Sequence, residues 1–383
     1  YDPELDLLYI GVGNGTPWNR SIRSPEGGDN LFLSSIVALR PDTGEYVWHY
    51  QTTPGETWDY TATQHILLAE IEVDGALRKV LMQAPKNGFF YVIDRTDGTL
   101  LSANNFIQIT WATHVDMQTG RPVEVPGARY PEETALIFPS YLGGHNWHPM
   151  SYNPETGLVY IPVLDIPANY ANDPVFKYQA DGPNLGVDGV IGSLPDSQAE
   201  RDAMQSLVSG RLVAWDPKTN AEVWRVDHKG SWNGGTLATA GGLVFQGTAD
   251  AKFKAFSADV GKQLWEFPTQ TGIVAPAVTY EIDGEQYVSV NVGWGGAFAL
   301  VFGEFVQAES VPNVSRVLTF KLGAGEKLPE PPWKPTVVFN PPEQTASPET
   351  IRRGHRLYHP TCMGCHGLNA VSGMLTPDLR GSP

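Results

Sequence analysis

The sequence is poor in basic residues, in cysteine and in long apolar runs, and each scarcity argues against a class of protein. Its 383 residues include 26 Lys and Arg against 42 Asp and Glu, a formal net charge of −16. Nucleic acids and anionic membranes attract clustered basic side chains, so we expect no partner of either kind. No apolar run reaches the roughly 18 residues of a membrane-spanning helix, so we expect no transmembrane segment. The chain also lacks an initiator Met and a charged, apolar leader, which predicts a fragment or a processed piece.

Glycine, proline and tryptophan are abundant, with 40, 31 and 11 residues, as expected of a large β domain with many turns. One unit, residues 253–267, alternates like a strand, turns at Asp and Gly, and continues as a second strand. A second copy keeps the spacing of its anchor residues, a third keeps it with two substitutions, and a weaker copy at residues 92–98 lacks the tryptophan. The anchors are Ala255, Asp259, Gly261 and Trp265; Ala38, Asp42, Gly44 and Trp48; and Ala214, Lys218, Asn220 and Trp224. The pattern predicts repeated hairpins.

A second repeated element precedes several of these hairpins. Residues 1–10 resemble residues 152–161, and residues 237–247 resemble both loosely. Strand, loop and hairpin that return in this way are typical of four-stranded blades arranged radially, so we predict an all-β propeller with about five blades in this chain. The last blade is carried by residues 286–301. A β-sandwich is the alternative, but radial repetition explains why each unit needs the same aromatic residue.

Three polar residues near predicted strand ends are candidates for a site. Asn14 lies between glycines, where its amide oxygen suits calcium, although an ordinary Asn-Gly turn is the plainer interpretation. Asp59 lies between Trp58 and Tyr60, which predicts a desolvated carboxylate with a raised pKa, as a general base requires; a turn-capping Asp is the alternative. Lys86 follows a strand and could bind an electronegative ligand atom or remain a solvated charge.

The strongest motif is Cys362-Met-Gly-Cys365-His366, which contains both cysteines of the chain. This pattern is the attachment signature of a c-type haem, with two thioether bonds and His366 as the iron ligand. A redox dithiol or half of a zinc site leaves the adjacent histidine unused and lacks a second cysteine pair. The sixth haem ligand is not identified, with Met374 a weak candidate.

Proline marks a change of domain before this motif. Seven prolines between positions 329 and 348 forbid a regular helix, and Ser347 with Pro348 then signals a helix start. We expect a partial propeller at residues 1–325, a linker at 326–347, and the start of an α-helical cytochrome c domain at 348–383. Residues 196–207 look helical and fall in an insertion within the propeller.

These motifs together resemble the quinoprotein alcohol dehydrogenases, eight-bladed propellers that bind pyrroloquinoline quinone and calcium at the axis. The resemblance rests on Asn14, Asp59 and Lys86 in their local sequences and on the repeated hairpins. It implies Asn14 as a calcium ligand, Asp59 as catalytic base and calcium ligand, and Lys86 as donor to the quinone oxygens. It also implies that the quinone contacts Asn146 and Trp147 in the segment 143–150, and Trp294 and Gly295 in the segment 292–297.

Other interpretations of the same segments stay open. His145 and His148 could suggest zinc, but no third ligand of that type lies nearby, and histidines that pack a loop are the alternative. Trp294 and Gly295 could be a glycine-rich strand end. Relatives that use a lanthanide carry a carboxylate two positions after the catalytic Asp; Thr61 stands there, which favours calcium.

The resemblance implies a periplasmic enzyme that oxidises a small alcohol to an aldehyde. Hydride passes to the quinone, and electrons then pass to the haem and to a downstream cytochrome, copper protein or quinone. A haem-bearing propeller that serves only as an electron-transfer scaffold is the alternative, as is a dehydrogenase for sugars or aldehydes. The joint presence of Asp59 and Lys86 favours an enzyme.

The haem motif makes a prediction that needs no knowledge of the substrate. Changing Cys362 and Cys365 together to Ala removes both thioether bonds, so the band that stains for covalent haem on a denaturing gel should disappear. Met363→Leu, a change inside the motif that spares both attachment cysteines and the histidine ligand, should keep the stain. A persistent stain in the double variant would refute the attachment site.

Overall fold

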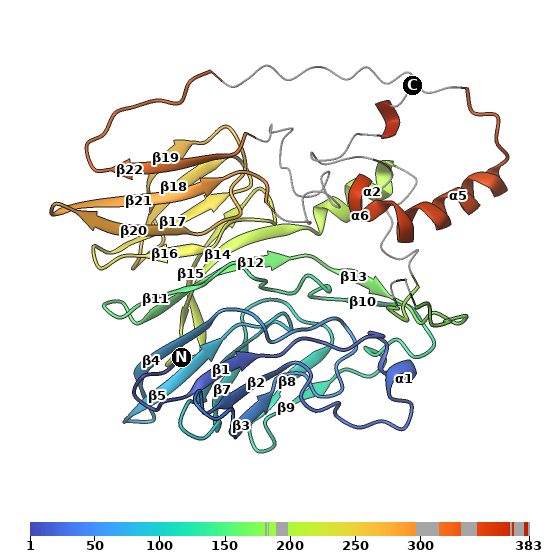
Figure 1. Ribbon diagram of the computed structural model, residues 1–383, viewed down its shortest axis with the longest axis horizontal. Coiled ribbons are helices and arrows are strands. Elements are labelled where there is room, and N and C mark those ends of the chain that lie inside the picture. The colour runs from blue at the N-terminus through green and yellow to red at the C-terminus, as the bar shows by residue number, and fades with distance from the viewer. Residues whose placement is uncertain are drawn as a thin grey trace. The chain divides into compact units, whose positions relative to one another are not determined.

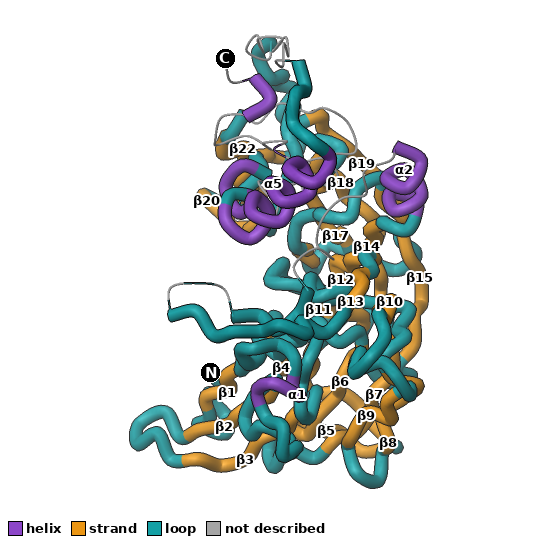
Figure 2. Tube along the Cα trace, turned by 90° about the vertical axis from the view of Figure 1, so that its right-hand side faces the viewer, coloured by secondary structure: helices purple, strands orange, loops and turns teal. Residues whose placement is uncertain are grey.

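The structure is a computed structural model, and it describes residues 1–180, 182, 184–188, 198–295, 314–330, 343–367, 370 and 379–381. The chain divides into two compact units. The first consists of Tyr1–Asp188, Arg211–Val226 and Ala258–Gly261, and the second contains the other described residues. Strands and loops dominate the described chain (Figure 2).

The first unit holds the N-terminal sheets, which Figure 1 labels along the chain. One sheet has the order β1-β2-β3, the next β4-β5-β6-β7, and a third β11-β12-β14-β15, with two-stranded ribbons β8-β9 and β10-β13 between them. The strands are β1 Leu8–Gly11, β2 Ser35–Leu39, β3 Tyr46–Gln51, β4 Ile66–Val73, β5 Ala76–Gln83, β6 Phe89–Asp94, β7 Leu100–Asn105, β8 Ala112–Asp116, β9 Arg121–Glu124, β10 Ala135–Ile137, β11 Ser151–Asn153, β12 Leu158–Asp165, β13 Ala168–Tyr170, β14 Ser209–Asp216 and β15 Ala221–His228.

Two further sheets belong to the second unit. Their orders are β16-β17-β18-β19 and β20-β21-β22. The strands are β16 Thr236–Ala238, β17 Leu243–Thr248, β18 Lys252–Ser257, β19 Gln263–Pro268, β20 Ala277–Ile282, β21 Glu285–Val292 and β22 Arg316–Lys321. Five sheets of three or four strands therefore occur in the described residues, as the repeats predict.

The repeated hairpins owe their spacing to strand pairing. Ala38 pairs with Trp48 across β2 and β3, and Ala255 pairs with Trp265 across β18 and β19. In both hairpins a register shift directly follows the alanine, so the two copies share a bulge as well as their anchors. The weaker copy forms the same kind of hairpin from β6 and β7, where Ser102 pairs with Val92 and takes the place of the tryptophan.

The tryptophan at the end of one copy of the repeated hairpin packs against the turn of the next copy along the chain. Trp48 lies over Gly98, and its Nε1 donates to the Arg95 carbonyl at 3.3 Å. Trp224 lies over Gly261 in the same way, and its Nε1 donates to the Ala258 carbonyl at 3.2 Å. Both contacts lie within the first unit, because the turn Ala258–Gly261 belongs to it. The repeated spacing thus places an indole against a hairpin turn in each case.

Helix is confined, among the described residues, to a few short elements. They are α1 Arg20–Arg23, α2 Gln198–Ser206, α5 Pro348–Thr361, α6 Met363–His366 and the 3-10 helix η3 Leu379–Gly381. The helical prediction for residues 196–207 is confirmed where the structure describes it, and Ser347 caps α5 as predicted, accepting a hydrogen bond from Thr350 N. In the described ranges, none of these helices has the length and hydrophobicity to cross a membrane.

The contact between Trp48 and Gly98 predicts an asymmetry between two glycines. Gly98 has φ +80, and a Cβ there would lie 2.7 Å from Trp48 Cε3; Gly44 has φ +71 with no atom within 4 Å of such a Cβ. Gly44→Ala should cost about 1 kcal/mol of unfolding free energy from backbone strain alone. Gly98→Ala should cost about 2–4 kcal/mol because the indole must also move. Urea unfolding compares them, and equal costs would contradict the packing role of Trp48.

Candidate functional site

The loop after β3 holds Asp59 between two fully buried aromatic rings. The Trp58 and Tyr60 rings stack at 5.5 Å, and both pack on Trp111. Trp58 Nε1 donates to the Ala128 carbonyl at 2.9 Å, and the Tyr60 hydroxyl donates to the Pro139 carbonyl at 2.5 Å. Asp59 itself has φ +65, a left-handed conformation that is uncommon outside glycine. The two rings are therefore fixed in the core, while the backbone turns sharply between them.

Asp59 and Lys86 form an ion pair in this structure. Lys86 Nζ lies 2.9 Å from Asp59 Oδ2 and 3.1 Å from its carbonyl oxygen. Both side chains are largely buried, with 11% of Lys86 and 18% of Asp59 exposed. Burial raises the pKa of the Asp59 carboxyl, and the Lys86 charge opposes that shift. The predicted desolvation of Asp59 is confirmed, and the interpretation of Lys86 as a solvated charge is wrong.

Two glycines hold the backbone of Lys86 in place. Gly143 has φ +82, and a Cβ at this position would lie 2.6 Å from Lys86 Cα. The next residue, Gly144, donates its N–H to the Lys86 carbonyl at 3.0 Å. The segment 143–150 therefore packs directly on the loop that carries Lys86, and only glycine permits this approach.

The loop that carries Asn14 runs beside the Asp59 loop. Ala62 N donates to the Val12 carbonyl at 3.1 Å, and Ser34 donates its N–H to the Gly13 carbonyl and its hydroxyl to the Tyr60 carbonyl. Asn14 is half-buried, and its Nδ2 donates to the Gly15 carbonyl at 3.4 Å, so Oδ1 is the atom that faces away from this bond. The chain thus brings the loops of Asn14, Asp59 and Lys86 together, although they are far apart in sequence.

Glu56 and Arg23 are two charged residues of this region that the sequence does not single out. Glu56 is fully buried, and its Oε1 accepts the N–H groups of Trp58 and Tyr60, the latter at 2.8 Å. Burial raises the pKa of Glu56 to about 7. Arg23 donates to the carbonyls of Pro17, Trp18 and Glu56. The only signal in the sequence is a carboxylate three residues before Asp59, and its burial could not be predicted.

After Gly144, His145 and Asn146 hydrogen-bond within the loop, whereas the ring of Trp147 is exposed. The His145 ring contacts the carbonyls of Ala84 and His148 at 2.7 and 2.5 Å, so both of its nitrogens serve the loop. This favours the interpretation of a packing histidine over a zinc ligand. Asn146 is engaged at both amide atoms, with the Leu142 carbonyl at 2.7 Å and Trp147 N at 2.8 Å. The Trp147 indole is 49% exposed and stacks on His148, with ring centres 4.1 Å apart.

Trp294 and Gly295 belong to the second unit. Trp294 is buried and lies against Gly272. The preceding residue, Gly293, donates its N–H to the Gly272 carbonyl at 2.9 Å. Gly295 is exposed, and a Cβ there would meet only Val274 Cγ2, at 3.6 Å. The contact of these two residues with a quinone stays a prediction.

The cysteine motif forms a single helical turn. Cys362 links α5 to α6, and His366 N donates to the Cys362 carbonyl at 2.9 Å. The spacing of three and four residues places Cys365 and His366 on the same side of this turn as Cys362. The two cysteines are not joined in a disulfide. This arrangement suits attachment of both thiols to one haem edge, whereas Met374 lies outside the described residues.

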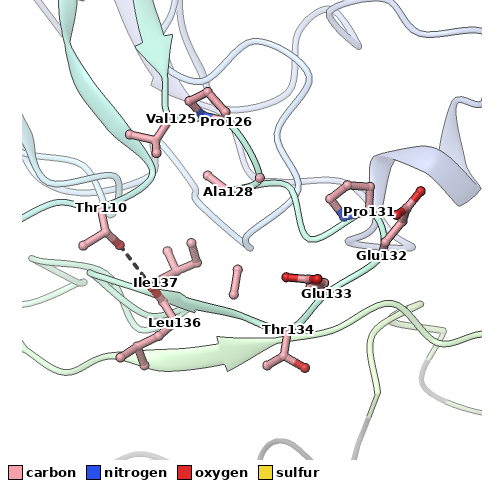
Figure 3. Close-up of a pocket in the computed structure, with 12 residues that line it drawn as sticks. Thr110, Val125, Pro126, Ala128, Pro131, Glu132, Glu133, Thr134, Leu136 and Ile137 are labelled. Carbon is pink, nitrogen blue, oxygen red and sulfur yellow. Dashed lines mark hydrogen bonds between the residues drawn. The ribbon is translucent and has the colours of Figure 1, made fainter.

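A separate cavity lies near the ribbons of the first unit. It has a volume of about 410 Å³ and is lined by segments 110, 125–128 and 131–137 (Figure 3). Its lining contains none of the residues predicted for the site. The described ranges also contain no cluster of three or more His, Cys, Asp or Glu side chains with the geometry of a metal site.

Comparison with known proteins places this arrangement in a family. The family model "Glucose/ethanol/alcohol dehydrogenase, beta-propeller domain" matches residues 1–105 and 228–288. Quinohemoprotein alcohol dehydrogenase ADH IIB of Pseudomonas putida is 52% identical over 383 residues, which are 100% of this chain and 54% of the relative. Quinohemoprotein alcohol dehydrogenase of Comamonas testosteroni is 45% identical over 377 residues, 97% of this chain and 51% of the relative.

Solved structures agree with the sequence comparison. Quinohemoprotein alcohol dehydrogenase ADHIIG from Pseudomonas putida superimposes with a TM-score of 0.95 at 50% identity, covering 100% of this chain and 56% of that one. A europium-containing methanol dehydrogenase gives a TM-score of 0.69 at 34% identity, covering 78% and 51%. The fold is thus a quinoprotein β-propeller, and the prediction of a propeller is confirmed. Over nearly its whole length the chain is similar to quinohaemoprotein alcohol dehydrogenases, and it spans about half the length of the curated relatives it matches.

The buried ion pair predicts a stability effect with a defined pH dependence. Lys86→Met leaves the Asp59 carboxylate without its cation, so in calcium-free protein it should lower the unfolding free energy by about 2–3 kcal/mol at pH 8. The pKa of Asp59, already raised by burial, should rise further, so the loss should shrink as the pH falls and the carboxyl becomes neutral. Urea unfolding at several pH values measures this.

A matched control separates burial from charge. Lys79→Met removes a pair with Glu4 of similar length, 2.8 Å, whose side chains are 37% and 51% exposed. It should cost under about 1 kcal/mol. Equal losses in the two variants would contradict the desolvated pair at Asp59.

Proposed function

We propose that the full-length protein is a periplasmic quinohaemoprotein alcohol dehydrogenase, which oxidises small alcohols to aldehydes. The observation that carries the proposal is the buried pair of Asp59 and Lys86, at 2.9 Å, in a chain whose haem motif lies within the alignment with the quinohemoprotein relative. Relatives at 52% and 45% identity carry the name quinohemoprotein alcohol dehydrogenase, and the similarity extends over almost all of this chain.

Asn14 and Asp59 supply oxygen ligands that fit calcium. A half-buried amide oxygen and a desolvated carboxylate are hard donors of the type this ion prefers. Asp59 Oδ2 faces Lys86, which directs Oδ1 to a cation. At the position that carries a further carboxylate in lanthanide relatives, Thr61 accepts hydrogen bonds from Gln64 at 3.0 Å and Thr63 at 3.1 Å. Two ligands are part of a calcium shell of six to eight oxygens, and a neutral Thr61 favours a divalent ion.

Several residues suit the planar, oxygen-rich pyrroloquinoline quinone, which when bound accepts the hydride of the alcohol. Lys86 has three N–H donors, and contacts with Asp59 account for two of them, so the third would be available to a quinone oxygen. The exposed indole of Trp147 offers a flat surface for the ring system. Asn146, Trp294 and Gly295 complete the proposed contacts, and Asn146 would have to exchange one of its loop hydrogen bonds.

Asp59 is the proposed general base. Its carboxylate is ionised beside Lys86, yet burial raises its pKa toward that of a group which can take a proton. The proton comes from the alcohol hydroxyl and is held on a carboxylate oxygen of Asp59. The surrounding rings of Trp58 and Tyr60 exclude water from one side of the carboxylate, which strengthens its interaction with the hydroxyl.

Cys362 and Cys365 are the proposed thioether attachments of haem c, with His366 as axial ligand, and electrons would leave through it to a periplasmic acceptor. The proposal includes a division into a propeller part at 1–325, a linker at 326–347 and a cytochrome part at 348–383. A haem-bearing scaffold without catalysis remains the second candidate, and it would retain haem without alcohol-dependent turnover.

The proposal is tested on full-length protein purified from periplasm. Denaturation should release a quinone that mass spectrometry identifies. Ethanol-dependent dye reduction should be lost when quinone and calcium are removed and should return when both are added back. If no quinone is released and none restores activity, the dehydrogenase is overturned and the scaffold is left.

Asp59→Asn in the same protein tests the base. The amide keeps the shape but cannot take the proton, so turnover should fall by at least about 100-fold while quinone stays bound. Asp97→Asn, at a turn remote from the site loops, should leave turnover unchanged. Undiminished turnover in the Asp59 variant would remove this residue as base.

A further inference from the structure

Glu56 occupies an unusual position for a carboxylate. It is fully buried, and one oxygen, Oε1, accepts the backbone N–H groups of both Trp58 and Tyr60. These are the two residues on either side of Asp59. Its second oxygen, Oε2, has no hydrogen-bond partner among the described residues. A buried carboxylate that accepts hydrogen bonds from two main-chain N–H groups of a single turn points to a role in shaping that turn.

The geometry of the turn explains why one oxygen reaches both groups. In an extended strand, N–H groups two residues apart lie too far apart to converge on one atom. They converge when the residue between them adopts a left-handed conformation, which forms the concave arrangement of N–H groups that binds anions. Asp59 has this conformation, with φ +65. Glu56 Oε1 therefore fills a concavity whose existence depends on the backbone of Asp59.

We infer that Glu56 is a positioning residue, which holds the Asp59 backbone in its left-handed conformation and so directs the Asp59 carboxylate toward Lys86 and the substrate side of the loop. The inference rests on the proposed role of Asp59 as base. Glu56 acts through hydrogen bonds to Trp58 N and Tyr60 N and contacts neither substrate nor cofactor.

The same residue connects to the neighbouring loop. The carbonyl of Glu56 accepts a hydrogen bond from Arg23 Nη2 at 2.5 Å, and Arg23 Nη1 donates to the carbonyls of Pro17 and Trp18 at 2.5 and 3.0 Å. Arg23 Nη2 also donates to Asn30 Oδ1 at 3.0 Å. Arg23 thus fixes the start of the Asp59 loop against the loop that carries Asn14, while Glu56 fixes its tip.

Loss of the Glu56 carboxylate should act locally. The Trp58 and Tyr60 rings are fixed in the core by packing on Trp111 and by their bonds to the Ala128 and Pro139 carbonyls. The flanking side chains would therefore stay in place while the peptide groups around Asp59 relax. A displacement of the base by a fraction of an ångström lowers turnover more than it lowers substrate binding.

The experiment uses full-length protein loaded with pyrroloquinoline quinone and calcium, with ethanol as substrate. Glu56→Ala should lower kcat between about 10- and 100-fold, with KM changed less than about threefold and the bound quinone still stoichiometric by absorbance. Glu56→Gln keeps an acceptor oxygen at the same place, so it should restore kcat to within about threefold of the wild type.

Asp2→Ala is the matched control. Asp2 is also a buried carboxylate, its Oδ1 accepts the N–H groups of Glu4 and Leu5 at 3.0 and 3.4 Å, and it pairs with Arg95. This variant should lose thermal stability like Glu56→Ala but keep kcat within about twofold. An equal loss of kcat in Asp2→Ala would show that general destabilisation is responsible and would overturn the positioning role.

Further outcomes separate this inference from the proposed function. Wild-type protein without ethanol turnover would refute the function itself. Active wild type, inactive Asp59→Asn and unimpaired Glu56→Ala would refute only the role of Glu56, as would a Gln variant no better than the Ala variant. If Glu56→Ala yields no folded protein, Glu56→Asp retracts the carboxylate by one methylene, and an unchanged kcat in that variant would equally overturn the inference.

Discussion

The contact between a hairpin tryptophan and the turn of the following hairpin is the constraint on which the first unit depends. Trp48 lies over Gly98 and Trp224 lies over Gly261, each with its indole N–H bonded to a carbonyl of that turn. Each contact combines apolar burial with a directional hydrogen bond, so it fixes the indole against the turn that it covers. The loops that carry polar residues emerge between hairpins held in this way, which lets short loops keep defined positions.

The fixed positions of the loops also explain why the Asp59 carboxylate is desolvated. The aromatic rings beside Asp59 are packed in the core, and they leave only 18% of the Asp59 side chain exposed to solvent. Its pKa is raised by burial, and Lys86 limits the shift because an ammonium group lies 2.9 Å away. The balance leaves an anion of increased basicity. A more exposed Asp59 would be a weaker base, and a buried Asp59 without Lys86 would have a pKa raised further.

Sequence was sufficient for features that depend on local chemistry. The hairpins follow from Asp and Gly at fixed offsets, the start of α5 from Ser347 and Pro348, and the desolvation of Asp59 from its aromatic neighbours. It was not sufficient for contacts between distant segments. That Lys86 pairs with Asp59, 27 residues earlier, was not predicted, because the family resemblance implied a separate role for each residue. Glu56 and Arg23 were missed because a charged residue outside the predicted strands is usually solvated, and only the tertiary structure shows that these two are not.

The charges around Asp59 indicate how one carboxylate can serve several partners. Two carboxylates, Glu56 and Asp59, lie close to two cations, Arg23 and Lys86. Burial raises the pKa of Glu56 to about 7, and the nearby Asp59 charge adds to that rise; a divalent ion at the proposed site would favour the ionised form of both carboxylates. An ionised carboxylate has about four acceptor positions, and Lys86 uses one of those on Asp59. The proposed roles of Asp59 as calcium ligand and as base would use the remaining positions, and the Lys86 pair would orient the carboxylate for both.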